Sequence, residues 1–258
     1  MSDLDLIVGA AREAGGIALR HFQSADLEVT QKPGDAGPVT EADLAVDRYL
    51  SDHLTGERPD YGWLSEETED DQTRLETERQ FIVDPIDGTR AFIDGARDWG
   101  VSIGIADRGR ITAAAVYLPA RDLLFSAALG SGAAKNGVSI QCSPRAEIDG
   151  ATILAAKPNL APDNWRGGTP PVARHFRSSL AYRLCLVAEG RFDGMMTLRP
   201  SWEWDIAGGS LIAAEAGAAL TDRRGKTLVF NGVHPKTDGV LAAGPPLHQQ
   251  LVSRLRTE

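Results

Sequence analysis

Two short apolar segments that each end in acidic residues constrain the fold of this chain most strongly. Tyr61-Gly62-Trp63-Leu64 leads into Ser65-Glu66-Glu67, and Phe81-Ile82-Val83 leads into Asp84-Pro85-Ile86-Asp87-Gly88-Thr89. Both segments have the length and composition of short buried strands. Acidic side chains at strand ends can converge on one point, so the pattern predicts a sheet with a carboxylate cluster at one edge.

Three further apolar segments follow at short intervals, over 101–106, 111–118 and 123–128. The residues between them, Asp107-Arg108-Gly109-Arg110 and Pro119-Ala120-Arg121-Asp122, are typical of turns. Turns at such short intervals predict antiparallel strands that follow one another as a meander.

Apolar residues also recur at helical spacing. Helices are predicted over 4–22 and, capped by Thr40, over 41–54, with a loop over the breaker-rich residues 31–38. In the second half, strands are predicted over 152–156, 194–198 and 228–230, and helices over 178–189, 205–216 and 246–256. Residues 156–177, rich in proline, are expected to form an exposed loop.

Sheets covered by helices, without the regular strand-helix alternation of a barrel, predict an α/β fold of the α+β kind. The 258 residues are enough for one large domain or for two closely joined halves. We expect a single catalytic domain over 1–258. Its N-terminal half, about 1–145, carries the main acidic motifs, and its C-terminal half, about 146–258, completes the site.

Composition excludes several classes of protein. The net charge of -9 argues against a nucleic acid polymer as partner, because such binding needs clustered Lys and Arg. The first twenty residues contain no continuous apolar run, so neither a signal peptide nor a membrane anchor is expected. The two cysteines, Cys142 and Cys185, are too few for a zinc cluster or a disulfide framework. We therefore expect a cytoplasmic protein.

The acidic motif around Asp84 suits a hard cation. Pro85 fixes its own φ and favours an extended Asp84, so Asp84 and Asp87 can flank a tight turn. Oxygen ligands with no histidine among them favour Mg²⁺ over zinc or copper. If a helix starts at Gly88-Thr89, its free N–H groups can bind a phosphate. The alternative is that Asp-Pro and Asp-Gly are ordinary turn pairs and that Thr89 is an ordinary cap.

A second acidic motif lies far along the chain, where Trp204-Asp205 precedes Ile206-Ala207-Gly208-Gly209. Asp205 could equally be a plain helix cap. The order of Glu66-Glu67, the Asp84 to Thr89 motif and this Trp-Asp motif resembles the inositol monophosphatase superfamily of lithium-sensitive, magnesium-dependent phosphatases. The resemblance covers nearly the whole chain.

The resemblance implies a metal site with two or three Mg²⁺ ions. Glu66, Asp84 and the Ile86 carbonyl would hold one ion, and Asp84, Asp87 and Asp205 would hold a second, with a looser third site near Glu66. It also implies the layered α-β-α-β-α sandwich of the inositol monophosphatase type and a homodimer.

The same resemblance implies how the phosphate and the water would be bound. The phosphate would lie on Asp87 and on the N–H groups of Gly88 and Thr89. Thr89, hydrogen-bonded to Asp43, and Glu66 would together position and deprotonate the attacking water.

The substrate implied is a small phosphorylated metabolite. Leu198 stands where inositol phosphatases carry a glutamate, which argues against inositol phosphate. The motif over 87–93 looks similar to that of bacterial CysQ-type 3′(2′),5′-bisphosphate nucleotidases, which favours the conversion of 3′-phosphoadenosine 5′-phosphate to AMP. Inositol 1-phosphate, histidinol phosphate and fructose 1,6-bisphosphate are the alternatives. Arg183 could meet a second phosphate or lie on a solvated helix face, and Trp202 and Trp204 could stack on a base or pack in the core.

Two other classes of function are weighed against catalysis. A non-catalytic regulator on the same fold is disfavoured by the full set of expected ligands. A calcium-stabilised structural protein is disfavoured because its ligands would normally come from one contiguous loop.

Overall fold

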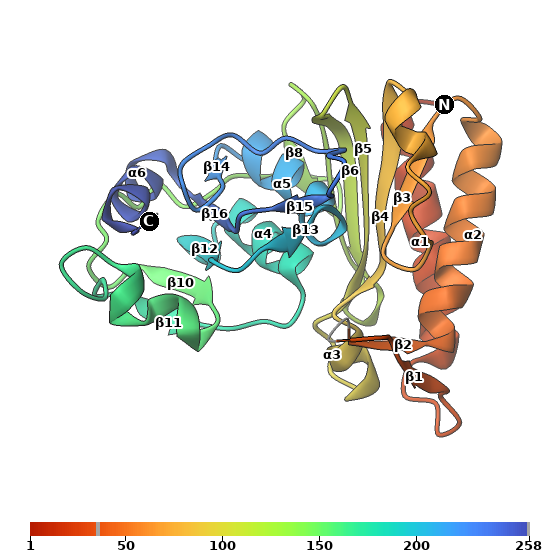
Figure 1. The fold of residues 1–258 in the computed structure, drawn as a ribbon, viewed down its shortest axis with the longest axis horizontal. Helices are drawn as coiled ribbons and strands as arrows, with labels where there is room; N and C mark the ends of the chain where they lie inside the picture. Colours follow the sequence, from red (N-terminus) through yellow and green to blue (C-terminus); the bar gives the residue numbers. More distant parts are fainter. Residues whose placement is uncertain (35–36, 257–258) are drawn as a thin grey trace.

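The computed structural model describes residues 1–34 and 37–256. Figure 1 shows five layers from side to side: two long helices, a large sheet, two central helices, a second sheet and a C-terminal helix. The layered α-β-α-β-α fold predicted from the sequence is confirmed. No helix among the described residues has the length and apolar character needed to cross a membrane.

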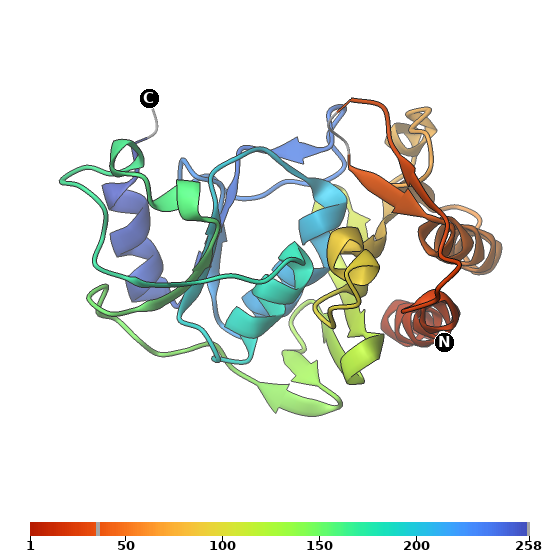
Figure 2. The same cartoon turned by 90° about the horizontal axis from the view of Figure 1, so that it is seen from below.

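The first layer consists of α1 (Asp3–His21) and α2 (Glu41–Glu57), which lie side by side against one face of the large sheet (Figures 1 and 2). Both predicted helices are confirmed. A capping box at Ser2 and Asp5 begins α1, and its alanine-rich face is buried. Thr40 begins α2 as predicted, and the short hairpin of β1 (Val29–Gln31) and β2 (Pro38–Thr40) borders the predicted loop. Positions 35–36 of that loop lie outside the described residues.

The large sheet has seven strands in the order β3-β4-β5-β6-β7-β8-β9. β3 (Gly62–Ser65) and β4 (Arg79–Asp87) are parallel, and every later neighbour is antiparallel. The predicted meander is confirmed in β5 (Gly100–Asp107), β6 (Arg110–Leu118) and β7 (Leu123–Ala128), and it continues into β8 (Ala133–Lys135) and β9 (Val138–Ile140).

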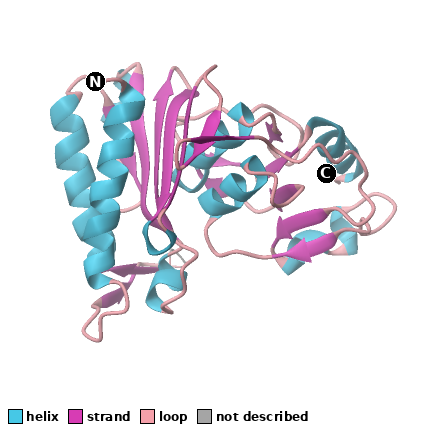
Figure 3. Cartoon of the chain, turned by 180° about the vertical axis from the view of Figure 1, so that it is seen from behind, coloured by secondary structure: helices cyan, strands magenta, loops and turns pink. Residues whose placement is uncertain are grey.

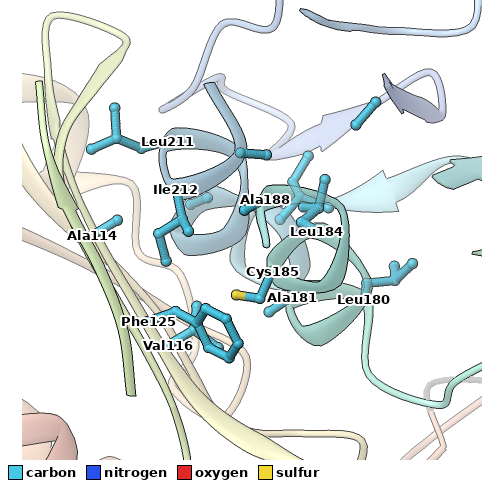
Figure 4. Close-up of a cluster of buried hydrophobic side chains, with 14 of the residues drawn as sticks. Ala114, Val116, Phe125, Leu180, Ala181, Leu184, Cys185, Ala188, Leu211 and Ile212 are labelled. Carbon is cyan, nitrogen blue, oxygen red and sulfur yellow. The ribbon is translucent and has the colours of Figure 1, made fainter. Parts of the chain in front are cut away.

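The middle layer consists of α4 (Leu180–Ala188) and α5 (Glu203–Glu215), which lie between the two sheets (Figure 3). All nine residues of α4 are buried, as expected for a helix covered on every side. Ala114, Val116 and Phe125 of the large sheet pack against both helices (Figure 4). Close packing requires the two glycines of α5: a Cβ on Gly208 would lie 2.8 Å from Ser102 Oγ, and one on Gly209 would lie 2.7 Å from Leu184 Cβ.

The second sheet has the order β11-β10-β12-β16-β14. Its strands are β10 (Thr152–Ala155), β11 (Ala173–His175), β12 (Gly194–Thr197), β14 (Ala219–Thr221) and β16 (Val240–Ala243). A separate pair, β13 (Ser201–Trp202) and β15 (Lys236–Thr237), lies nearby, and α6 (Pro245–Arg254) forms the outer layer. The strands predicted over 152–156 and 194–198 and the C-terminal helix are confirmed.

Two predictions for the second half were wrong. Residues 228–230 form no strand: Val229 is 67% exposed, and the segment makes one backbone hydrogen bond, from Phe230 N to Gly109 O in the turn between β5 and β6, while Phe230 packs in the core. The 156–177 segment is not simply an exposed loop, because it contains two short 3₁₀ helices and β11. Trp165 and Asn159 within it are buried and hydrogen-bonded to each other. An apolar run or a proline indicates only the local conformation that a segment prefers. Whether the segment pairs as a strand or is buried depends on contacts with distant parts of the chain.

Candidate active site

The carboxylates of Glu66, Asp84 and Asp205 converge on one point. One ligand oxygen from each lies within 4.8 Å of the others. β3 and β4 are parallel, with Ser65 opposite Val83, so Glu66 and Asp84 leave the same edge of the sheet. The third carboxylate comes from the first turn of α5, where Trp202 occupies the cap position, so the alternative reading of Asp205 as a plain helix cap was wrong.

The environment of Asp84 fits a hard divalent cation. Its side chain is 1% exposed, and Oδ1 has no hydrogen-bond partner among the described residues. Burial and the neighbouring carboxylates of Glu66, Asp87 and Asp205 raise the pKa of Asp84 well above its ordinary value. A buried oxygen without a partner costs free energy, and a bound cation would offset both this cost and the repulsion between the carboxylates. An oxygen-only donor set matches the preference of Mg²⁺.

Asp87 is not one of the three converging carboxylates, and it contacts the start of α4 instead. It accepts hydrogen bonds from Ser179 Oγ at 2.5 Å, Ala181 N at 2.6 Å and Leu180 N at 3.2 Å. Burial raises the pKa of Asp87 to about 6, although these hydrogen bonds oppose the shift. Its predicted role as a metal ligand therefore remains a prediction. The sequence did not reveal Ser179 as its partner, although a helix was predicted to begin there.

A register shift between β4 and β5 positions this turn. Asp84 pairs with Ser102 and Asp87 pairs with Gly100, so Pro85 and Ile86 lie in a bulge of β4. Gly88 follows with φ 103° and begins the short helix α3 (Thr89–Ile93). The predicted helix start at Gly88-Thr89 is thus present, as a single short turn.

Thr89 contacts the two groups expected of it. Its hydroxyl lies 3.2 Å from Asp43 Oδ1 and 3.2 Å from the Ile86 carbonyl. Asp43 is buried, and its other oxygen accepts hydrogen bonds from Thr40 N and Thr40 Oγ1 in the capping box of α2. The cap of α2 therefore fixes the carboxylate that contacts Thr89.

Lys32 is a site residue that the sequence reasoning missed. Its ammonium lies 2.7 Å from Glu66 Oε1 and 2.8 Å from Glu67 Oε1. Burial raises the pKa of Glu67 to about 7, although the hydrogen bond from Lys32 opposes the shift. The sequence showed Lys32 only as a lysine in the breaker-rich loop over 31–38, so it could not have been singled out.

The two predicted specificity residues are Arg183 in α4 and Leu198 directly after β12. Arg183 is buried rather than solvated, and its guanidinium donates to the carbonyl oxygens of Arg177 at 2.6 Å and Ser178 at 3.4 Å. Burial lowers the pKa of Arg183 to about 10. Leu198 is 6% exposed and packs in an apolar cluster of the second sheet and α6. At that position the chain offers a substrate no polar side chain.

Comparison with known proteins gives one consistent family. The model of the inositol monophosphatase family matches residues 2–258. Nus factor SuhB of Escherichia coli is 30% identical, with 99% of this chain and 96% of that protein covered. An inositol-1-monophosphatase of Rhizobium meliloti is 34% identical over 86% of each chain. Among solved structures, extragenic suppressor protein suhB of Bartonella henselae has a TM-score of 0.80 at 29% identity, covering 96% of each chain. An IMPase of Thermotoga maritima has a TM-score of 0.82 at 27% identity, covering 98% of this chain and 96% of that one.

Proposed function

Because the chain belongs to the inositol monophosphatase family, we propose that it is a magnesium-dependent phosphatase that hydrolyses a small phosphorylated metabolite. The observation that carries the proposal is the convergence of Glu66, Asp84 and Asp205 around a buried carboxylate oxygen without a partner. Glu66, Asp84, the Ile86 carbonyl, Asp87 and Asp205 would hold the ions. Bound Mg²⁺ supplies positive charge that acidifies water and stabilises the leaving group.

The residues of the chain would handle the proton of the attacking water. The Thr89 hydroxyl has one proton and therefore donates to one acceptor at a time. Donation to Asp43 leaves the Thr89 oxygen free to accept from the water, and it leaves the Ile86 carbonyl available as a ligand. Glu66 then accepts the proton of the water as that oxygen attacks phosphorus and the bond to the leaving group breaks.

The phosphate would lie against Asp87 and the N–H groups of Gly88 and Thr89. The positive φ of Gly88 supports this placement, because the backbone there turns without a side chain between it and the anion. A Cβ on Gly88 would lie 3.0 Å from the Asp98 carbonyl, so the turn itself requires glycine.

Two substrates are supported by different observations. The absence of a polar side chain at Leu198 argues against inositol 1-phosphate, and the motif over 87–93, which is similar to that of CysQ-type bisphosphate nucleotidases, supports 3′-phosphoadenosine 5′-phosphate. The relative named inositol-1-monophosphatase supports inositol 1-phosphate. We propose the first as substrate. A panel of both compounds with histidinol phosphate and fructose 1,6-bisphosphate tests it, and a preference of more than about tenfold for inositol 1-phosphate would overturn it.

A second candidate function follows from the relatives named Nus factor SuhB. A regulatory role of this chain would not need hydrolysis. The convergent carboxylates support catalysis instead. Burying the carboxylate of Asp84 costs free energy of folding, and a regulator would have no need of such a group. Phosphate release by the purified chain with Mg²⁺, lost in Asp84→Asn, would support catalysis, and its absence from the wild type would favour the regulator.

We further propose that the chain functions as one domain, as a homodimer in the cytoplasm, and that lithium inhibits it. The site itself supports a single domain, because Asp205 of the C-terminal half joins Glu66 and Asp84 of the N-terminal half. Sedimentation would test the dimer, and phosphate release with added lithium at millimolar concentrations would test the inhibition.

A further inference from the structure

A cavity of about 470 Å³ lies beside the carboxylate cluster. It is lined by Glu66 and Thr68 from the segment after β3 and by Trp202, His234 and Lys236 from β13, β15 and the residues before β15. Cavities that bind small molecules measure about 300–1,000 Å³. Because Glu66 belongs both to this cavity and to the converging carboxylates, a substrate whose phosphate is bound at the cluster can extend into the cavity.

Lys236 is fixed on the wall of this cavity by an aromatic surface. Its ammonium lies 3.7 Å from the ring centroid of Trp202, and the two residues pair directly between β13 and β15. Trp202 also stacks on Trp204, with ring centroids 4.5 Å apart and planes inclined by 13°. Both faces of Trp202 are therefore covered, and a nucleobase cannot stack on it in this arrangement.

The positive charge of Lys236 is not neutralised within the described part of the chain, where it forms no ion pair with a carboxylate. The acidic residues of the cavity are already paired. Glu66 contacts Lys32 at 2.7 Å, and Asp70 contacts Arg74 at 2.7 Å. An ammonium has three N–H donors, so Lys236 retains donors for an anion.

The segment that leads to Lys236 is held in place by two buried charged residues. The carboxylate of Glu203 accepts hydrogen bonds from Asn231 N at 2.6 Å and Gly232 N at 3.0 Å. The guanidinium of Arg74 donates to Asn231 Oδ1 at 2.5 Å and to the Gly232 carbonyl at 3.0 Å. Arg74 and Glu203 are each 1% exposed. This wall is therefore formed before a ligand arrives, which lowers the entropic cost of binding.

We infer that this cavity binds a second anionic group of the substrate, with Lys236 as its ion-pair partner. The substrate class is a small molecule that carries the scissile phosphate and, a few bonds away, another phosphate or a carboxylate. Lys236 determines specificity and does not touch the reacting atoms. The inference rests on the proposed function, because it takes the carboxylate cluster as the place of hydrolysis.

Matched pairs of substrates test this inference. Adenosine 3′-monophosphate and 3′-phosphoadenosine 5′-phosphate differ by one phosphate, and glycerol 3-phosphate and 3-phosphoglycerate differ by one carboxylate. Lys236→Ala should raise KM for the doubly anionic member of at least one pair by about five- to tenfold, with its kcat unchanged. KM for the singly anionic members should not change, and Lys236→Arg should keep the wild-type preference because it retains the charge.

Lys226→Ala is the matched control, since Lys226 is an exposed lysine that does not line the cavity. It should leave every KM unchanged. Equal effects of Lys236→Ala on both members of each pair, or no effect on any, would overturn the inference. If the wild type hydrolyses none of the four compounds, 3′-phosphoadenosine 5′-phosphate fails as the proposed substrate, and calorimetric binding of the same pairs still decides whether Lys236 recognises the second anion.

Discussion

The carboxylate of Asp87 accepts a hydrogen bond of 2.5 Å from the hydroxyl of Ser179, which joins the end of β4 to the start of α4. Two backbone N–H groups of α4 donate to the same carboxylate. The interaction satisfies donors that a helix N-terminus otherwise leaves unpaired. Asp87 therefore stabilises the fold and is also a predicted site residue. Its contribution to stability and its contribution to activity can be measured separately.

Asp87→Asn should reduce magnesium-dependent phosphate release by at least about a hundredfold. It should also lower the free energy of unfolding by about 1–3 kcal/mol, because one amide oxygen cannot replace two carboxylate oxygens as acceptors. Ser179→Ala is the control: it removes one donor to Asp87, so it should cost about 1–2 kcal/mol and leave activity within a few-fold. Phosphate assays and urea unfolding measure both effects. Full activity in Asp87→Asn would refute its role in the site.

Thr89→Val should lower kcat by about a hundredfold or more, because valine can neither donate to Asp43 nor accept from water. Thr89→Ser should restore most of the activity, since the hydroxyl is retained. KM should change little in either variant. Steady-state kinetics provide the measurement, and equal losses in the two variants would contradict the role of the hydroxyl, because serine retains it.

The metal-free protein should lose stability as the pH rises. Burial raises the pKa of Asp87 from 3.8 to about 6 and that of Glu67 from 4.5 to about 7. A carboxyl group whose pKa rises on folding stabilises the fold fully below its unfolded pKa, and this stabilisation is lost as the pH passes the folded pKa. With chelator present, the urea midpoint should therefore be lower at a pH of about 8 than at about 5.

Added Mg²⁺ should raise the urea midpoint more at the higher pH, because the ion binds ionised carboxylates. A metal-free protein that is equally stable at both values of pH would contradict the burial of these charges. Asp84→Asn serves as control, since it removes the most deeply buried carboxylate of the cluster and should reduce the effect of Mg²⁺.

Gly209→Ala should destabilise the fold by about 1–3 kcal/mol, because the new methyl group would lie 2.7 Å from Leu184 Cβ. Gly9→Ala in α1 is the control, since no atom lies within 4 Å of a Cβ there. That substitution should stabilise the protein by about 0.5–1 kcal/mol through helix propensity. Thermal unfolding of the two variants would test whether their effects on stability have opposite signs. A stabilised Gly209→Ala would mean that α4 and α5 pack less closely than described.

The sequence predicted those features that depend on local pattern. Apolar segments separated by turns predicted the meander of β5, β6 and β7, and helical spacing with Thr40 as cap predicted α2. The carboxylates at the ends of β3 and β4 were predicted to converge, and Glu66 and Asp84 do so. In each case the information lies within a few residues of the feature.

Features that depend on distant contacts could not be predicted in this way. Lys32 reaches Glu66 and Glu67 across more than thirty residues. Arg183 was expected either to meet a second phosphate or to lie on a solvated helix face, because nothing in its own helix shows that the 177–178 carbonyls will cover its guanidinium. The 228–230 segment has the composition of a strand but finds no strand to pair with along its length.

Asp205, the last member of the converging set, lies at position 205 of 258 and belongs to the helix that packs between both sheets. During synthesis on the ribosome, Glu66 and Asp84 emerge long before it. The cluster is therefore incomplete until about four-fifths of the chain has been made and α5 has docked through its glycines. The nascent protein thus cannot assemble its three-carboxylate cluster before its fold is nearly finished.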